Sequence, residues 1–347
     1  MSGTARRSTP TAPSPRRWRA KPRRRPTPRS PRAATTGPAG HPGLGQGPLR
    51  HGRAARLRRH AAAAAGALEA DGPVVARLRG QRAVVTGKSH TVEFALGGLG
   101  TNRHWGAPWN PWDAAHHRVP GGSSSGRRHR QRRSSALVAL GSDTTGSVRM
   151  PASWTGTVGL MVSHGRWPVE GIVPVAPVLD APGLLTRTVA DQCRPSWRST
   201  ARRSWPPRTR STSAAASCAA VRLGVAESFF WSGCSPGVAG GVRAALAELE
   251  RAGAVLVDLA MPEPQPVYEM FQKGHLSTAA VYGMIEGEFA DLWETLDPNV
   301  RLRLEQHGAN LSAHEYVARL RRIEELDARR RRAARQRSTR WCCRPSR

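Results

Sequence analysis

Lysine, acidic residues and aromatic residues are all scarce in this chain. Its 347 residues include 24 Asp and Glu against 54 Lys and Arg, and the only lysines are Lys21, Lys88 and Lys273. The formal net charge of +30 is of the size that ordinarily indicates a nucleic acid or an anionic membrane as partner. The arginines crowd into a few blocks, however, and with 5% aromatic residues they are not interleaved with stacking side chains. We therefore expect no specific nucleic-acid partner.

Paired cysteines and long apolar runs are missing as well. The five cysteines are odd in number and show no CxxC spacing, so neither a disulfide framework nor a metal site is indicated. No run of about 18 apolar residues predicts a transmembrane helix, and the first residues contain no apolar core of a secretory signal. The Arg- and Ser-rich start is typical of a mitochondrial transit peptide, but its prolines prevent an amphipathic helix. We expect no membrane partner, and the cytoplasm is the default location.

Residues 1–60 consist largely of Pro, Arg, Gly and Ser, with almost no bulky apolar side chains. Such a segment cannot bury enough surface to offset chain entropy, so the composition predicts disorder. The pattern changes from Ala61 onward. Leu68, Val74, Val75 and Leu78 recur at roughly helical spacing, and residues 83–85 then read as a short buried strand.

Another α/β unit is legible near residues 221–260. The pattern predicts a strand at 221–226, an amphipathic helix at 238–252 and a second strand at 254–259. Residues 267–327 look helical, most clearly at 315–330. Alternating strands and helices favour a layered α/β fold.

Three short segments carry candidate chemistry: Gly87–Ser89, residues 120–126 (PGGSSSG) and residues 141–152 (GSDTTGSVRMPA). Their glycines let backbone N–H groups converge on one point, as an oxyanion hole requires. A serine nucleophile needs a base within hydrogen-bond reach, and the chain has no GxSxG elbow and no evident Ser/His/Asp ordering. A lysine base is the remaining possibility. It must be neutral, so burial has to lower its pKa from about 10.4 to near 7, at a cost of roughly 4–5 kcal/mol.

Gly87–Ser89 is not a phosphate-binding loop, because that motif needs a glycine where the chain has Arg82. Residues 141–191 resemble the serine- and glycine-rich signature of the amidase-signature family. Residues 120–126 match the loop that precedes this signature, and residues 87–113 match the segment with the family's lysine. The interval from Ser123 to Ser147 also fits the family pattern. The resemblance implies an α/β fold with a central mixed β-sheet flanked by helices on both faces, incomplete here at both ends.

The same resemblance implies catalytic roles. Ser147 is the nucleophile, Ser123 is a bridging serine that follows a cis peptide bond, and Lys88 is the base. The backbone N–H groups of Thr144, Thr145 and Gly146 are expected to bind the oxyanion. The implied activity is hydrolysis of a small carboxamide to carboxylate and ammonia through an acyl-enzyme, with no cofactor and no metal. A homodimer is left open.

Two alternatives remain: a glutaminase-like A subunit of a tRNA-dependent amidotransferase, and an inactive amidase remnant. Asp143 and Arg149 are interpreted as braces of the signature loop rather than reacting groups. His116 and His117 are neighbours and diverge on any regular element, which favours a loop surface over a metal pair. The tryptophans in the loop at 105, 109 and 112 either line a substrate channel or pack against prolines.

The chain departs from the family in blocks rich in arginine. Residues 127–133 contain five arginines where the family has a buried helix of small residues, and charges of this number cannot be buried unpaired. This composition recurs in three places: the stretches 127–135 and 192–215 and the basic tail 329–347. We therefore divide the chain into a disordered segment at 1–60, a partial amidase-signature domain at 61–328 and the tail at 329–347. We interpret the blocks as out-of-frame translations of an amidase gene whose C-terminal portion is truncated. Translating the coding DNA in its other two frames tests this hypothesis.

Overall fold

A computed structural model describes residues 71–81, 83, 89–125, 136–192, 221–226, 228–272, 276–337 and 340–342. Several predicted features lie outside the described residues. They are residues 1–60, the predicted strand at 83–85 beyond Ala83, Lys88, the arginine block at 127–133 and nearly all of 192–215. In the N-terminal half the elements are α3 (Pro73–Gly80), η1 (Glu93–Ala95), β1 (Val138–Asp143), α4 (Arg149–Thr155), β2 (Val158–Met161), β3 (Ala181–Thr186) and α5 (Val189–Gln192).

In the C-terminal half they are β4 (Arg222–Val225), α7 (Ser228–Trp231), α8 (Pro236–Arg251), β5 (Val255–Asp258), α9 (Pro264–Gln272), α10 (Leu276–Glu288), η2 (Ala290–Thr295), α11 (Pro298–Arg303), η3 (Leu304–Gly308), α12 (Ala313–Arg337) and β6 (Arg340–Cys342). Within these ranges, no helix combines the length and the apolar character that a bilayer crossing needs.

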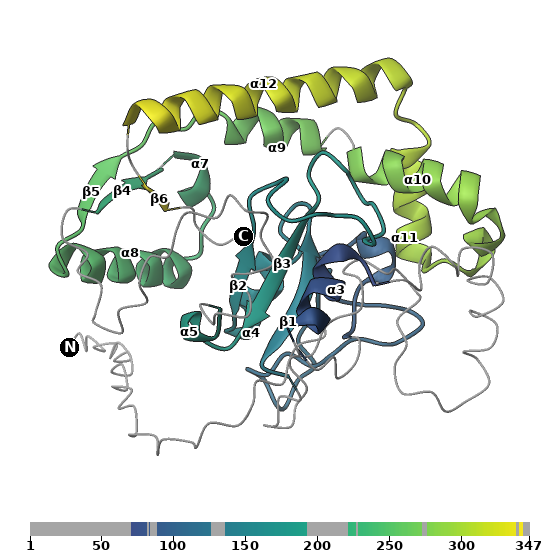
Figure 1. Cartoon of the computed structure of the whole chain (residues 1–347), viewed down its shortest axis with the longest axis horizontal. Coiled ribbons are helices and arrows are strands. Elements are labelled where there is room, and N and C mark those ends of the chain that lie inside the picture. The colour runs from purple at the N-terminus through teal and green to yellow at the C-terminus, as the bar shows by residue number, and fades with distance from the viewer. Residues whose placement is uncertain are drawn as a thin grey trace, which may run out of the picture. The chain divides into compact units, whose positions relative to one another are not determined.

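The first sheet has the strand order β1–β3–β2, with β3 antiparallel to both neighbours (Figure 1). Val138 lies opposite Thr186 and Asp143 lies opposite Ala181, so the pairing runs along the whole of β1. Every residue of β1 and β3 is buried. Because successive side chains of a strand point to opposite faces, both faces of this sheet must be covered by other elements.

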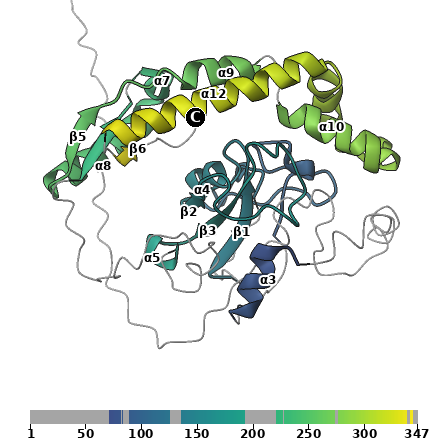
Figure 2. The same ribbon diagram turned by 45° about the horizontal axis from the view of Figure 1, so that its top comes forward.

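Helices α3 and α4 provide that cover from opposite sides (Figure 2). Leu78 of α3 packs with Val138 and Leu140 of β1. Ala139, between these two in the sequence, packs instead with Ala152 of α4. The alternation along β1 therefore assigns one face of the sheet to each helix.

The second sheet has the order β5–β4–β6, and β4 pairs in parallel with both neighbours. Parallel neighbours need a crossover connection, which α7 and α8 supply between β4 and β5. Ala226, Leu259 and Met261 form a small core beside this sheet, with Phe230 packed against it.

A further core joins η1 and the residue after it to the C-terminal helices. Phe94 and Leu96 pack with Val281 and Ile285 of α10 and with Leu304 of η3. This cluster is separate from the one around β1. The segment that follows the predicted catalytic lysine is thereby anchored by helices from the other end of the chain.

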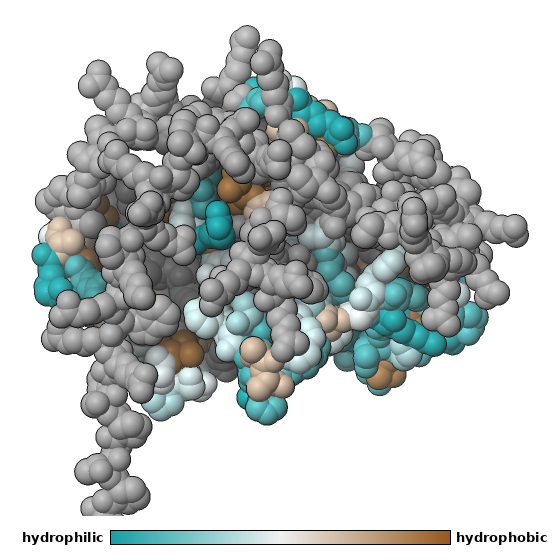
Figure 3. All heavy atoms as spheres, turned by 90° about the horizontal axis from the view of Figure 1, so that it is seen from below, coloured by the Kyte–Doolittle hydropathy of each residue, from teal (hydrophilic) through white to brown (hydrophobic). Residues whose placement is uncertain are grey.

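Exposed hydrophobic side chains are scattered over the described surface. In Figure 3 the hydrophobic residues of the described part form small patches between hydrophilic ones. The exposed large ones come from different elements, among them Trp112, Val189 and Val238. Isolated exposed apolar residues are normal for a folded chain and indicate no interaction surface by themselves.

The predicted α/β class is confirmed. The expected helix around 74–78 is α3, the expected strands near 221–226 and 254–259 are β4 and β5, and the expected helix at 238–252 is α8, which begins at Pro236. Residues 267–327 are helical from α9 to α12, with breaks. One difference concerns the sheet. In the described part of the chain, antiparallel and parallel pairings occur in two three-stranded sheets, where the resemblance implied one mixed sheet.

Candidate active site

The signature loop turns around the carboxylate of Asp143, at the end of β1. Asp143 is 0% exposed, and its Oδ1 accepts a hydrogen bond from the Gly146 N–H at 2.7 Å. Its Oδ2 accepts from the N–H groups of Val148 at 3.1 Å and Arg149 at 3.2 Å. The Arg149 guanidinium contacts both oxygens, at 3.0 and 2.9 Å. The predicted role of Asp143 and Arg149 as braces of the loop is confirmed.

Burial by itself would raise the pKa of Asp143, but the hydrogen bond and charge of Arg149, with the N–H groups of Val148 and Gly146, lower it overall. A carboxyl with a lowered pKa contributes stability that is present above its ordinary pKa, about 3.9, and is lost as the pH falls through the lowered value. The Asp143→Asn variant leaves the N–H groups and Arg149 facing a neutral amide. We expect its free energy of unfolding at pH 7 to fall by about 1–3 kcal/mol.

Thermal denaturation of both proteins across the acid range checks this expectation. The difference in Tm between parent and variant should be constant above about pH 4 and shrink below it, because the parent then loses the same charge. A difference in Tm that grows below about pH 4 contradicts the assignment.

Ser147 and Ser123 lie on loops that are hydrogen-bonded to each other. The N–H of Ser124 donates to the Ser147 carbonyl at 3.1 Å, and the Ser124 hydroxyl contacts the Ser142 carbonyl at 3.4 Å. The peptide bond between Gly122 and Ser123 is cis, as the resemblance implied. Ser123 is 1% exposed, and its Oγ has no hydrogen-bond partner within the described ranges. A buried hydroxyl without a partner is uncommon and marks a candidate functional group.

Gly141 permits the close contact between β1 and the Ser123 loop. A Cβ at this position would lie 2.6 Å from Ser124 Oγ and 2.8 Å from Val148 Cγ2. Both neighbours are buried, so neither has free space into which it can move. A side chain at position 141 would therefore separate the two loops.

We expect the Gly141→Ala variant to lose about 1–3 kcal/mol of folding stability through overpacking, and to lose turnover because Ser124 adjoins Ser123. Gly240→Ala is the matched control, because a Cβ there meets nothing within 4 Å and Gly240 lies in the interior of α8. Alanine in that helix should be neutral or raise the stability by about 0.5–1 kcal/mol. Chemical denaturation measures both effects, and equal stability of the two variants would refute the packing argument.

Lys88 lies outside the described residues, but the segment that follows it is tied to the serine loop. The N–H of Val92 donates to the Ser123 carbonyl at 3.1 Å. His90 Nδ1 lies 2.8 Å from Ser125 Oγ, and His90 Nε2 lies 2.9 Å from the Gly106 carbonyl. Because a carbonyl only accepts, the neutral ring carries its proton on Nε2, and Nδ1 accepts from the serine hydroxyl. Burial lowers the pKa of His90, although the hydrogen bond to Gly106 acts in the opposite direction. The lowered pKa favours the neutral ring.

A buried carboxylate anchors the next part of this segment. Glu93 Oε1 lies 2.9 Å from His104 Nε2, and Glu93 Oε2 accepts from the Asp297 N–H at 2.6 Å. The hydrogen bond with Glu93 raises the pKa of His104. The Asp297 carboxylate in turn accepts from the Arg103 N–H at 3.0 Å and caps α11. The sequence alone does not point to His90, Ser125, Glu93 or Asp297, because only the fold brings them to these contacts.

The predicted oxyanion donors differ in their surroundings. The Gly146 N–H is taken up by Asp143, whereas the Thr144 hydroxyl donates to Asp180 Oδ1 at 2.5 Å and Thr145 is exposed. Gly146 has φ of +130°, a conformation that favours glycine. Of the three predicted oxyanion donors, the Gly146 N–H is therefore already engaged by a carboxylate.

His116 and His117 lie on an exposed loop and bind different groups, Asp113 and the Ala107 carbonyl, so the surface interpretation is confirmed. No group of three His, Cys, Asp or Glu side chains that could hold a metal ion occurs in the part of the chain that was described. Trp109 stacks edge-on against His117, with 4.9 Å between the ring centroids. Trp112 packs on Gly156 at the end of α4.

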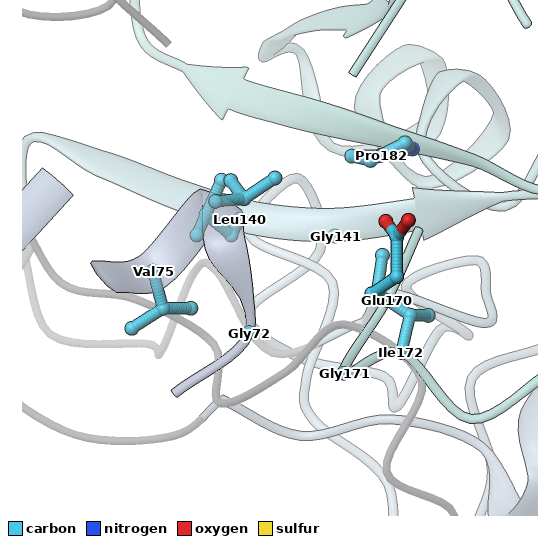
Figure 4. Close-up of a pocket in the computed structure, with 9 residues that line it drawn as sticks. Gly72, Val75, Leu140, Gly141, Glu170, Gly171, Ile172 and Pro182 are labelled. Carbon is cyan, nitrogen blue, oxygen red and sulfur yellow. The ribbon is translucent and has the colours of Figure 1, made fainter. Parts of the chain in front are cut away.

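A small pocket lies beside the sheet but apart from the two serines (Figure 4). Its walls come from the start of α3, from Leu140 and Gly141 of β1, from residues 170–172 and from Pro182. Leu140 points to the α3 face of the sheet, whereas the Ser123 loop contacts Gly141 from the α4 side. Glu170, whose side chain extends toward Pro182 in Figure 4, is the one ionisable residue of its lining. The pocket is thus not the site of the candidate nucleophile.

A sequence profile described as Amidase matches residues 61–339. The 2-amino-5-chloromuconic acid deaminase of Comamonas testosteroni is 44% identical over 253 residues, which are 73% of this chain and 54% of that protein. The A subunit of the glutamyl-tRNA(Gln) amidotransferase of Symbiobacterium thermophilum is 38% identical over 202 residues, 56% of this chain and 41% of that protein. The chain spans about half the length of these curated relatives.

A solved amidase crystal structure superposes with a TM-score of 0.67 at 25% identity, over 85% of this chain and 62% of that one. A structure of 6-aminohexanoate cyclic dimer hydrolase with substrate superposes with a TM-score of 0.57 at 24% identity, over 74% of this chain and 56% of that one, and supports the fold alone.

Proposed function

Because the chain belongs to the Amidase family, we propose that it hydrolyses a small carboxamide to a carboxylate and ammonia, with Ser147 as nucleophile. The observation that carries this proposal is the Ser123 hydroxyl. It is buried, without a partner in the described part of the chain, and on a loop bonded to the backbone of Ser147. A hydroxyl both donates and accepts, so it can relay a proton between a nucleophile and a base.

The reaction begins when Ser147 Oγ attacks the amide carbonyl. The Ser147 proton passes to Ser123 Oγ while Ser123 gives its own proton to the neutral amine of Lys88. The tetrahedral intermediate carries its negative charge toward the N–H groups of Thr144 and Thr145. The proton returns along the same relay to the leaving nitrogen, the C–N bond breaks, and ammonia departs from the acyl-enzyme. Water then attacks the ester and gives a proton to Ser123 while Ser123 gives its own to Lys88, and the same relay returns a proton to Ser147 Oγ as the bond to the acyl group breaks and the acid leaves.

Two measurements on the purified chain test the proposal together. Incubation with a panel of small carboxamides should release ammonia, and addition of hydroxylamine should divert the acyl group into a hydroxamate. Hydroxamate formation identifies an acyl-enzyme, because an enzyme that activates water directly forms no such ester. A chain that releases neither product from any member of the panel refutes the proposed function and supports the inactive remnant.

A glutaminase activity is the second candidate, supported by the 38% identity to an amidotransferase A subunit over 202 residues. L-glutamine is therefore included in the panel, alone and with other amides. The relative from Comamonas testosteroni is named a deaminase of 2-amino-5-chloromuconic acid, so 2-aminomuconic acids belong in the panel as well. Ammonia is the common product of these reactions, and the rank order of rates separates the candidates.

Three expectations stay predictions: the cytoplasmic location, the possible homodimer, and the domain boundaries after residues 60 and 328. Helix α12 runs through the proposed boundary to Arg337.

A further inference from the structure

The carboxylate of Asp180, a residue that the sequence analysis did not single out, is connected to the signature loop. Asp180 is 4% exposed and immediately precedes β3. The pairing of Asp143 with Ala181 ends the β1–β3 ladder, so the next residues outward, Thr144 and Asp180, face each other. The Thr144 hydroxyl donates to Asp180 Oδ1 at 2.5 Å, the short distance of a charge-assisted bond.

The same carboxylate also holds a turn of the preceding chain. Its Oδ2 accepts from the Val175 N–H at 2.9 Å, and both oxygens lie 3.1 Å from the Ala176 nitrogen. No Lys, Arg or His side chain pairs with Asp180 in the described ranges, so N–H and O–H donors alone balance its charge. These donors use both carboxylate oxygens as acceptors. An amide at position 180 would offer them only one acceptor oxygen.

Two buried carboxylates thus hold the short signature loop. Asp143 holds the inner side through Gly146, Val148 and Arg149. Asp180 holds Thr144 from the end of the neighbouring strand. The N–H groups proposed for the oxyanion lie between these anchors, and a hydroxyl engaged by Asp180 leaves Thr144 its backbone N–H for the substrate.

We infer that Asp180 is a positioning residue that fixes the Thr144 N–H for oxyanion binding through the Thr144 hydroxyl. This inference rests on the proposed function. The oxyanion forms only after the nucleophile has attacked. A misplaced donor therefore stabilises the transition state less and leaves binding of the substrate in the ground state nearly unchanged. Asp180 therefore affects kcat rather than KM.

Thr144→Val removes this bond in the full chain, and Asp180→Asn weakens it, because the amide offers one acceptor oxygen to donors that the carboxylate meets with two. We expect each to lower kcat about 10- to 100-fold with little change in KM, because a small misplacement of a reacting group has effects of this order. The double variant should lose no more than Thr144→Val alone, since both changes act on the same interaction. Thr144→Ser keeps the hydroxyl and should restore most of kcat.

Asp191→Asn is the matched control. Asp191 is 9% exposed, and its Oδ2 accepts from the hydroxyl of the exposed Thr188 at 2.8 Å, so this variant also takes a buried carboxylate away from a threonine hydroxyl. The Asp191→Asn variant should lower Tm but should not lower kcat at constant KM. A kcat of Asp180→Asn equal to that of Asp191→Asn overturns the inference, and so does full activity of Thr144→Val.

Amide hydrogen exchange of peptides that cover residues 143–149 gives a readout independent of turnover. Asp180→Asn should speed exchange in these peptides, whereas Asp191→Asn should not. A parent chain that hydrolyses no amide contradicts the proposed function, and the exchange still decides about Asp180. Unchanged exchange in the Asp180→Asn variant overturns the positioning role whether or not the parent is active.

Discussion

The Ser147→Ala variant should release ammonia from the preferred amide roughly 10⁴- to 10⁶-fold more slowly than the parent chain. Alanine has no nucleophile, so the acyl-enzyme cannot form, and losses of this size follow removal of a serine nucleophile from other hydrolases. The rate is measured as ammonia released under saturating amide, and acyl transfer to hydroxylamine should vanish in parallel.

Ser153→Ala is the control for this variant. Ser153 lies in α4 directly after the motif at 141–152 and is exposed, so the loss of its hydroxyl should leave the rate unchanged. Hydroxamate formation by Ser147→Ala would mean that another group carries the acyl intermediate. Equal melting temperatures of the parent and both variants would separate loss of chemistry from loss of fold.

Replacement of Lys88 should have the next largest effect. General-base catalysis contributes about 10²- to 10⁴-fold, and we expect Lys88→Ala to lose an amount in this range. The informative comparison is Lys88→Arg, which keeps the positive charge but cannot become neutral near pH 7. If Lys88 acts as a neutral base, arginine should be as inactive as alanine in the ammonia assay.

A Lys88→Arg variant with near-parent kcat would show that position 88 needs charge rather than a base, and would remove the relay. The Ser123 hydroxyl offers an internal check. Ser123→Ala should be strongly impaired, and the Lys88→Ala/Ser123→Ala double variant should be little worse than the poorer single variant, because groups that act as a unit are not additive. Additive losses would contradict a relay through Ser123.

Local pattern was enough for most elements of the fold. The helical spacing of Val74, Val75 and Leu78 predicted α3, because a helix that covers a sheet must bury one face. The strands β4 and β5 and the helix α8 follow from their own residues as well. The arrangement of the strands in the described ranges into two sheets did not follow, because pairing depends on which distant segments share a core.

The same division holds for the candidate site. Asp143 lies within six residues of all the groups that it binds, so its role as a brace could be predicted from the motif alone. Asp180 and His90 could not be found in this way. Thr144 lies 36 residues from Asp180 and Ser125 lies 35 residues from His90, and only the β1–β3 register and the folding of the loop before Ser125 bring them together.

By itself, the sequence was enough to predict Ser123, Ser147 and Lys88 as candidate catalytic residues with glycine-rich turns around them, because these belong to short contiguous motifs. The tertiary structure decided how these motifs are held. It placed Ser124 against Gly141, removed the Gly146 N–H from the set of free donors, and anchored Thr144 to a carboxylate on the next strand. The physical reason is that hydrogen bonds and close packing act between atoms a few ångströms apart, and distance along the chain does not fix distance in space.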